Sequence, residues 1–241
     1  MLRIPPSLSS PFLWTALCLL TACAGSPAAP LAPGAEAPVR KGLNDRFLVE
    51  DLSVDDFVQI FELESREIAA KRSEILASMQ IEPGDDVADV GAGTGLFLAP
   101  FSEAVGATGT VYAVDISTGF VEHLRERAQE EDLQNVEVVL CTEKDVLLPA
   151  NSVDAVLICD VFHHFTYPTT TMGSIFRSVR PGGELFLVDF ERIPGVSREW
   201  VIGHVWAGKE TFRSLVEDSG FRFVEEIDVG LSENYMLRFR R

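Results

Sequence analysis

The chain has 241 residues, of which 46% are hydrophobic and 24% charged, and its formal net charge is −17. This length and composition suit one globular domain with a full core and a small appendage. Nucleic acids are bound through concentrated Lys/Arg patches, which this acidic sequence lacks, so we expect no nucleic-acid partner.

The first 23 residues differ from the rest of the chain. They contain one cation, Arg3, an apolar run over residues 12–20, and the ending Leu20-Thr21-Ala22-Cys23. The run is shorter than the about 20 apolar residues of a membrane-spanning helix, so it predicts a signal peptide over residues 1–22. Leu-Thr-Ala-Cys resembles a bacterial lipobox, which implies that Cys23 becomes the lipidated first residue. We therefore expect a lipoprotein anchored in a membrane, on the periplasmic or outer-membrane face. A misassigned start codon and a cytoplasmic protein are the alternative.

Residues 23–44 are rich in alanine and proline and contain almost no large apolar side chain. Such a segment cannot bury enough surface to offset the entropy of ordering, so it predicts a flexible tether. The globular domain is then expected over residues 45–241.

Helical and strand periodicities alternate after the tether. Apolar residues at broadly helical spacing over 54–79 predict lead-in helices that end before Pro83. Short apolar runs predict five buried strands, at residues 87–90, 111–114, 136–140, 155–159 and 185–188. Amphipathic patterns predict helices over 96–105, from Ser117 or Thr118 to about 128, over 172–179, and over about 209–219, where Gly220 provides a stop.

The C-terminal end departs from this alternation. Two strand-like segments, 223–229 and 235–239, are joined by residues 230–234. So short a link cannot form a parallel crossover and predicts an antiparallel β-hairpin. Five βα units followed by such a hairpin resemble the class I S-adenosylmethionine-dependent methyltransferases. The resemblance implies an α/β, Rossmann-like fold with a seven-stranded, mostly parallel sheet in the order 3-2-1-4-5-7-6 and strand seven reversed.

A glycine-rich loop, Asp89-Val90-Gly91-Ala92-Gly93-Thr94-Gly95, follows the first strand. In an open parallel sheet this position is where a ligand binds, and glycine permits the tight turn and the close approach of the backbone. The dinucleotide fingerprint is G-x-G-x-x-G, whereas the shorter Gly91-x-Gly93-x-Gly95 spacing resembles the methyltransferase loop. Asp115 ends the second strand, where a carboxylate can accept both hydroxyls of a ribose. Nicotinamide proteins share such a loop and acid, so an NAD-dependent oxidoreductase stays an alternative.

Two later segments favour the methyltransferases. Asp154-Ala-Val-Leu-Ile-Cys-Asp160, with Val-Phe-His-His-Phe after it, resembles the fourth-strand motif of small-molecule methyltransferases, and residues 179–189 resemble the segment leading through strand five. The resemblance implies a donor-binding core at 82–190 with S-adenosylmethionine as cofactor. The implied binding residues are Asp89, Gly91, Ala92, Gly93, Gly95, Asp115, Ile116, Thr142, Glu143 and Asp160.

The resemblance also assigns roles to these residues. The loop would contact the methionyl part of the donor, Asp115 the ribose and Ile116 the adenine. Thr142 and Glu143 stand where many members place an acid near the adenine amino group, and Asp160 would face the methionyl amine. Asp89 either contacts the donor or braces the loop.

Methyl transfer from a sulfonium is an in-line displacement that needs a base only if the acceptor must lose a proton. His163 and His164 follow the fourth strand and are the candidate bases, with packing as their alternative role. No Asn/Asp-Pro-Pro-Tyr motif follows that strand, which disfavours an enzyme that methylates amino groups of DNA bases. Strand five ends Asp189-Phe190 without the Asp-Asn pair of metal-dependent catechol-type enzymes, which disfavours that class. By elimination, the expected acceptor is a small organic molecule. No cysteine has a metal-ligand spacing, so we predict no metal site. A non-catalytic, membrane-tethered module that binds S-adenosylmethionine is the alternative function.

Overall fold

The computed structural model describes Met1, residues 36–64 and residues 66–241. The rest of the predicted signal peptide, Cys23 and the tether up to residue 35 lie outside the described residues. Within the described part of the chain, no helix is long and apolar enough to cross a bilayer.

One seven-stranded sheet organises the domain, with the strand order β3-β2-β1-β4-β5-β7-β6. Strands β1 to β5 are parallel, and β7 is antiparallel to both of its neighbours. The order and the reversed strand predicted from the sequence are therefore confirmed. The strands are β1 (Asp86–Val90), β2 (Thr110–Asp115), β3 (Val136–Leu140), β4 (Val153–Cys159), β5 (Val179–Phe190), β6 (Arg222–Glu226) and β7 (Asn234–Arg240).

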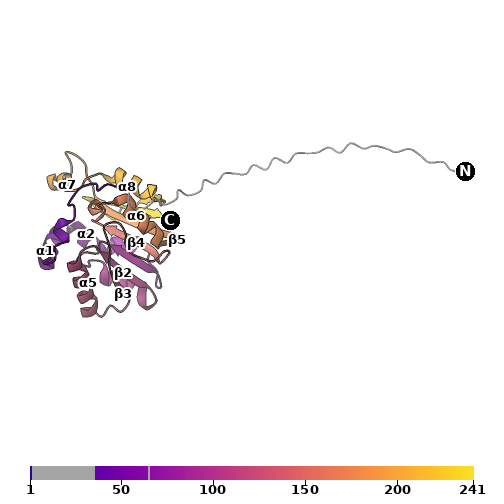
Figure 1. The fold of residues 1–241 in the computed structure, drawn as a ribbon, viewed down its shortest axis with the longest axis horizontal. Helices are drawn as coiled ribbons and strands as arrows, with labels where there is room; N and C mark the ends of the chain where they lie inside the picture. The colour runs from indigo at the N-terminus through magenta and orange to yellow at the C-terminus, as the bar shows by residue number, and fades with distance from the viewer. Residues whose placement is uncertain (2–35, 65) are drawn as a thin grey trace.

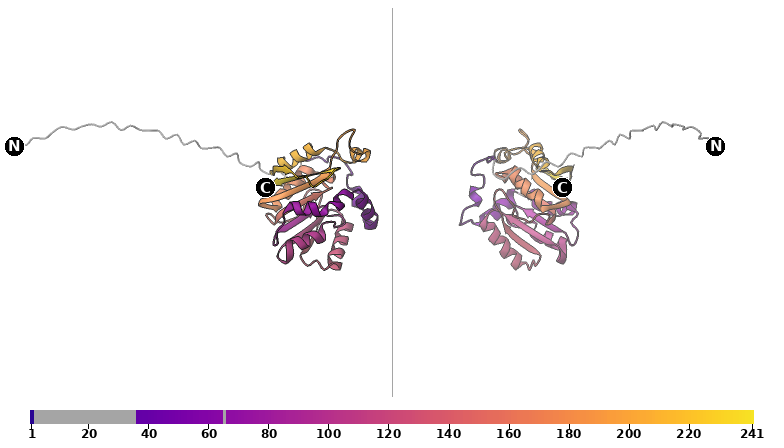
Figure 2. Two further views of the ribbon diagram at one scale, coloured as in Figure 1. Left: turned by 180° about the vertical axis from the view of Figure 1, so that it is seen from behind. Right: turned by 45° about the vertical axis from the view of Figure 1, so that its right-hand side comes forward.

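Helices cover both faces of this sheet (Figures 1 and 2). Helix α5 lies against β2 and β3 at one end of the sheet, whereas α6 and α8 pack towards β5 and β6 at the other. The helices are α1 (Val54–Glu64), α2 (Arg66–Ala70), α3 (Arg72–Met79), α4 (Leu98–Val105), α5 (Thr118–Glu130), α6 (Pro168–Ser178), α7 (Glu199–His204) and α8 (Lys209–Asp218), with 3₁₀ turns η1 (Asp45–Phe47), η2 (Gly106–Thr108) and η3 (Phe162–His164).

The core is divided by the sheet into two apolar layers. Along β4, Val156 and Ile158 point into a cluster with Met172 of α6, whereas Leu157 points into the other layer with Ile75 of α3 and Phe101 of α4. This alternation follows from the two-residue period of a strand. Because both faces are buried, the central strands consist of nearly continuous apolar runs, as parallel strands covered by helices do.

Two helix starts show how the sequence sets the elements. Ser117 is the N-cap of α5, and its hydroxyl accepts a hydrogen bond from the Phe120 amide at 3.4 Å. Helix α6 starts with Pro168, and its free amides at Thr169 and Thr170 donate to the Glu36 carboxylate at 2.9 and 2.7 Å. A carboxylate at this position accepts hydrogen bonds from amides that have no partner within the helix, and its negative charge is favourable near the positive end of the helix dipole.

The N-terminal segment, residues 36–47, packs onto the domain. Besides the Glu36 contact, the Val39 amide donates to the Thr166 carbonyl at 3.0 Å. The Asn44 side-chain amide donates to the carbonyl of His164 at 3.0 Å and to the hydroxyl of Thr166 at 3.1 Å. From Glu36 onward, therefore, the end of the range predicted as tether is held against α6 and the loop after β4.

Candidate functional site

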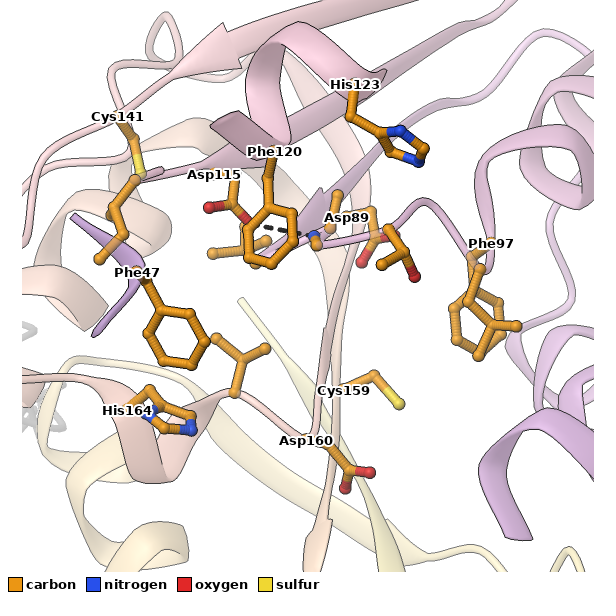
Figure 3. A pocket seen from close by; sticks show the side chains of 18 of the residues that line it. Phe47, Asp89, Phe97, Asp115, Phe120, His123, Cys141, Cys159, Asp160 and His164 are labelled. Carbon is orange, nitrogen blue, oxygen red and sulfur yellow. Dashed lines mark hydrogen bonds between the residues drawn. The ribbon is translucent and has the colours of Figure 1, made fainter. Parts of the chain in front are cut away.

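A pocket of about 690 Å³ lies at the carboxyl ends of the parallel strands (Figure 3). The loop after β1, the end of β2 and the loop after β4 form its floor, and the lead-in helices and η1 form the opposite wall. Pockets for small ligands are typically 300–1,000 Å³, so this one is large enough for a nucleotide-sized molecule. Of the ten residues that the sequence assigns to donor binding, every one except Gly95 lines the pocket.

The glycine loop brings its backbone to the pocket surface. Gly91, Gly93 and Gly95 have φ angles of +81°, +52° and +83°, a left-handed conformation that favours glycine. The amides of Gly91 and Ala92 both donate to the Val114 carbonyl, at 2.7 and 3.1 Å, which ties the loop to β2. A Cβ on Gly91 would overlap both methyl groups of Val161. Glycine is thus required at position 91 by conformation and by space.

Asp115 ends β2 beside this loop and is buried. One of its oxygens accepts a hydrogen bond from the Gly93 amide and the other from the Ser117 amide, both at 2.9 Å. Each carboxylate oxygen has a second lone pair, so both can still accept from a ligand hydroxyl. Burial raises the pKa of Asp115 to about 6, although the hydrogen bonds from Ser117, Gly93 and Ile116 act in the opposite direction.

Asp89 lies at the same edge, near the end of β1, and is 4% exposed. Burial, and then the negative charge of Asp115, raise its pKa to about 7. The two acids lie on neighbouring strands and line one pocket, which therefore has a strongly acidic end (Figure 3). A cationic ligand group would stabilise the ionised form of both acids.

Thr142 and Glu143 lie on the loop after β3. The Thr142 hydroxyl accepts hydrogen bonds from the amides of Lys144 and Asp145 at 3.2 and 3.0 Å, which brace the loop. One oxygen of Glu143 accepts from the Thr166 hydroxyl at 2.6 Å and from the Asn44 side chain at 3.1 Å. Glu143 therefore also holds the N-terminal segment in place at the pocket wall.

Asp160 follows β4 with a φ of +52°, an uncommon conformation for a residue other than glycine. Its carboxylate accepts a hydrogen bond from the side chain of Asn234, the first residue of β7, at 2.6 Å. Strained backbone held by a buried partner is frequent at ligand sites. The reversed strand thus fixes an acid at the pocket edge, and this contact could not be predicted from the local sequence around either residue.

The two candidate bases have different positions. His164 lines the pocket and packs edge-on against Phe47, with 5.2 Å between ring centroids (Figure 3). His163 is 2% exposed and lies behind it, with Nδ1 at 2.8 Å from an Asp189 carboxylate oxygen. Burial, followed by the neighbouring His163, lowers the pKa of His164 well below its usual value. His164 is therefore a neutral imidazole at the pocket wall.

Several pocket residues had no signal in the sequence. Asn44 and Phe47 come from the N-terminal segment, Phe120 and His123 from the first turns of α5, and Arg127 from its last turn. The Arg127 side chain donates to the Thr94 carbonyl at 2.9 Å and so braces the glycine loop. Their positions depend on how distant segments pack together.

Comparisons with known proteins agree with this geometry. Residues 88–187 match the family model described as a methyltransferase domain. The chain is 31% identical over 114 residues to the ubiquinone/menaquinone biosynthesis C-methyltransferase UbiE of Hydrogenovibrio crunogenus, covering 47% of this chain and 45% of that protein. It is 30% identical over 126 residues to the demethylmenaquinone methyltransferase of Listeria welshimeri, covering 52% of this chain and 53% of that protein. The chain thus spans about half the length of these curated relatives.

The fold has solved counterparts as well. A SAM-dependent methyltransferase from Aquifex aeolicus superimposes with a TM-score of 0.69 and 24% identity, covering 78% of this chain and 98% of that one. The residues around the pocket fit the donor of that class. The loop backbone at Gly91 leaves no space for a Cβ, and the buried carboxylates of Asp89 and Asp115 are available for hydroxyl and cationic groups. Residues 88–187 therefore match a methyltransferase domain, within a fold that a solved methyltransferase shares.

Proposed function

We propose that this protein transfers a methyl group from S-adenosylmethionine to a small organic acceptor. The observation that carries the proposal is the pocket floored by the glycine loop, with Asp115 beside it, inside the segment that matches the methyltransferase domain. The donor supplies a sulfonium carbon that is already activated for displacement. The protein then has to bind the two reactants, orient them and exclude water.

The roles proposed for the donor residues follow their places in the pocket. The loop backbone at Gly91–Gly95 lies against the methionyl part, and the acids Asp89 and Asp160 favour its ammonium group. Asp115 accepts from the ribose hydroxyls. Ile116 and Phe120 offer apolar surface to the adenine, and the loop containing Thr142 and Glu143 lies near its edge.

For the acceptor we propose an aromatic hydroquinone ring, the reduced form of a quinone, whose electron-rich carbon can attack the sulfonium methyl group. Support comes from the names of the two curated relatives, a ubiquinone/menaquinone C-methyltransferase and a demethylmenaquinone methyltransferase. Apolar side chains that line the pocket, among them Phe47, Val58 and Phe165, suit such a ring. Methylation of a ring carbon forms a C–C bond and releases the ring proton, and His164 is the candidate base at the pocket wall. His163 lies one layer behind it.

For the location we propose that Cys23 is lipidated and that residues 24–35 connect the domain to a membrane. Support comes from the lipobox-like Leu20-Thr21-Ala22-Cys23 and the preceding apolar run. A membrane location would place the enzyme beside a lipid-soluble acceptor. The NAD-dependent oxidoreductase and the non-catalytic binding module have no support among the compared proteins.

Calorimetry on the full chain tests the donor site, with S-adenosylhomocysteine and NAD as ligands. We expect S-adenosylhomocysteine to bind and NAD not to bind. Asp115→Asn should weaken binding by about 10-fold or more, because hydrogen bonds to a charged group contribute about 1.5–3 kcal/mol. Asp218→Asn is the matched control, because Asp218 is exposed at the end of α8 and neither it nor its chain neighbours line the pocket. Absence of S-adenosylhomocysteine binding would sink the proposal.

A further inference from the structure

Three of the four histidines of the chain lie together beside the pocket. His163 and His164 belong to η3, after β4, and His204 ends α7. The ring centroids are 4.4 Å apart for His163 and His164, and 5.0 Å from His204 to each of them. One ring nitrogen from each residue lies within 4.8 Å of the others.

Three imidazoles are a donor set that transition metals bind. Catalytic zinc sites often use three protein ligands and keep the fourth position open, and three histidines are one such set. With zinc–nitrogen distances of 2.0–2.1 Å, tetrahedral ligands lie about 3.3 Å apart, so closing this cluster needs shifts of about 1 Å. Side-chain rotation of the half-buried His204 on a short helix can supply such a shift.

A carboxylate behind the cluster fixes one ring. The Asp189 side chain is fully buried, and one of its oxygens lies 2.8 Å from His163 Nδ1. Metal-binding histidines commonly donate their other ring N–H to a carboxylate, which sets the tautomer and increases the basicity of the ligating nitrogen. Because this contact occupies Nδ1, Nε2 is the nitrogen of His163 that is left to bind a metal.

A second observation points to a missing ligand. Nδ1 of His164 is buried and has no hydrogen-bond partner among the described residues. An unsatisfied buried polar atom destabilises the folded state, because it loses its hydrogen bonds to water without replacing them. Aromatic packing against Phe47 and Trp200 accounts for burial of the rings, since Phe47 lies 5.2 Å from His164 and Trp200 lies 5.8 Å from His204. It does not account for the convergence of three ring nitrogens, or for the unpartnered Nδ1 of His164.

We propose that His163, His164 and His204 bind a divalent transition-metal ion, with zinc as the first candidate, and that Asp189 orients His163. Imidazole ligands suit zinc, copper, iron and nickel, whereas calcium and magnesium prefer oxygen. The site borders the pocket through His164, so the open coordination position would be available to an oxygen of the acceptor. A metal-bound hydroxyl loses its proton more readily, which would activate a phenolic ring. This last role depends on the proposed methyl transfer and would replace His164 as the base, because an imidazole nitrogen that binds a metal cannot accept a proton. Metal binding itself does not depend on the proposed methyl transfer.

Metal binding is tested on the full chain after treatment with EDTA and desalting. Zinc chloride is titrated by calorimetry with excess Mg²⁺ present to occupy exposed carboxylates. We expect one zinc ion per chain. His204→Gln and His164→Gln should each lower the affinity by more than the about 10- to 100-fold that loss of a supporting carboxylate costs, and Asp189→Asn by about that amount. His123→Gln, which changes the fourth histidine, should leave it unchanged.

Co²⁺ gives a second readout on the unaltered chain, which does not depend on the folding of any variant. A tetrahedral site with nitrogen ligands should give visible d–d absorption without the intense charge-transfer band of a thiolate. The proposal is overturned if cobalt shows thiolate or octahedral ligation, if zinc does not bind, or if a correctly folded His204→Gln variant retains full affinity. Zinc binding without S-adenosylhomocysteine binding would overturn the proposed function and leave the metal site intact, and the reverse result would do the opposite.

Discussion

Asp89 and Asp115 lie on adjacent strands and are both buried, so the ligand-free pocket holds two acids that resist ionisation. Their pKa values are raised to about 7 and about 6, mainly by burial. In the unfolded chain both acids would ionise near the ordinary aspartate pKa of 3.8. The folded protein therefore retains protons in the range between these values, where the unfolded chain has lost them.

The pH dependence of stability follows from this difference. As pH rises from 5 to 8, ionisation of Asp89 destabilises the folded state, because the unfolded carboxyl is already ionised. Asp89→Asn removes this effect, so the stability of the variant relative to the unaltered chain should grow by roughly 2–3 kcal/mol over that range. Urea unfolding of both chains at several pH values measures the difference. Buried histidines also titrate, but they are common to both chains, so their effects on the stability difference cancel. A stability difference between the two chains that does not change with pH would contradict the prediction.

The prediction of individual site residues relied on their positions at the ends of parallel strands. Asp89, Asp115 and Asp160 follow β1, β2 and β4, whose carboxyl ends meet at one edge, and all three line the pocket. Asn44 and Phe47 were missed, because they reach the pocket from a segment with no local motif. The sequence also predicted no metal site, since metal-ligand spacing is visible only when ligands lie near one another along the chain.

At the scale of the element, the loop between β1 and α4 is the most constrained part of the site. Its conformation depends on glycine at position 91. Any other residue there would have to adopt a left-handed φ, and its side chain would overlap Val161. Gly182 has a similar φ of +86° but open space around its Cα. The two glycines therefore separate conformational strain from steric overlap.

Gly91→Ala should destabilise the protein more than Gly182→Ala does. The left-handed conformation costs about 1–2 kcal/mol in both variants, and the overlap with Val161 adds about 1–3 kcal/mol in the first alone. Chemical unfolding of both variants measures the costs. S-adenosylhomocysteine binding should also weaken in Gly91→Ala and remain unchanged in Gly182→Ala. Equal stability of the two variants would mean that the loop can move away from Val161.

Element boundaries were predicted less completely than element types. Strand β5 begins at Val179, several residues before the predicted run, and its pairing with β4 includes a register shift between Val153 and Ala155. The apolar run marks only the part of β5 that is buried on both faces. Helix α7 has six residues, too few for a helical period to stand out, and it brings His204 to the cluster.

At the scale of the whole molecule, the short final link predicted the antiparallel hairpin, and the alternation of strands and helices predicted the parallel crossovers. The strand order itself was implied by the resemblance to the methyltransferases. The docking of residues 36–47 was not predictable, since proline- and alanine-rich composition indicates low propensity for order and gives no information about specific contacts. Glu36 and Asn44 are polar residues in such a stretch, and they are held by partners more than 90 residues away.

Attachment to a membrane is a prediction about the whole chain. In bacterial cells fed a labelled fatty acid, the unaltered protein should incorporate label and sediment with membranes. Cys23→Ser should lose both properties, because it removes the thiol that would carry the lipid. Cys18→Ser changes the neighbouring cysteine within the apolar run and is the matched control, so it should keep both. Label on the Cys23→Ser chain, or its absence from the unaltered chain, would reject the anchor.

Residues 36–47 enter the domain through the wall of its pocket. Asn44 bonds to Glu143 and Thr166, and Phe47 packs against His164. Fraying of this segment and emptying of the pocket are consequently linked equilibria, in which a ligand that contacts the wall shifts the chain towards its docked form. Susceptibility of the entry segment to proteases thus becomes a reporter of occupancy, readable without knowledge of the acceptor.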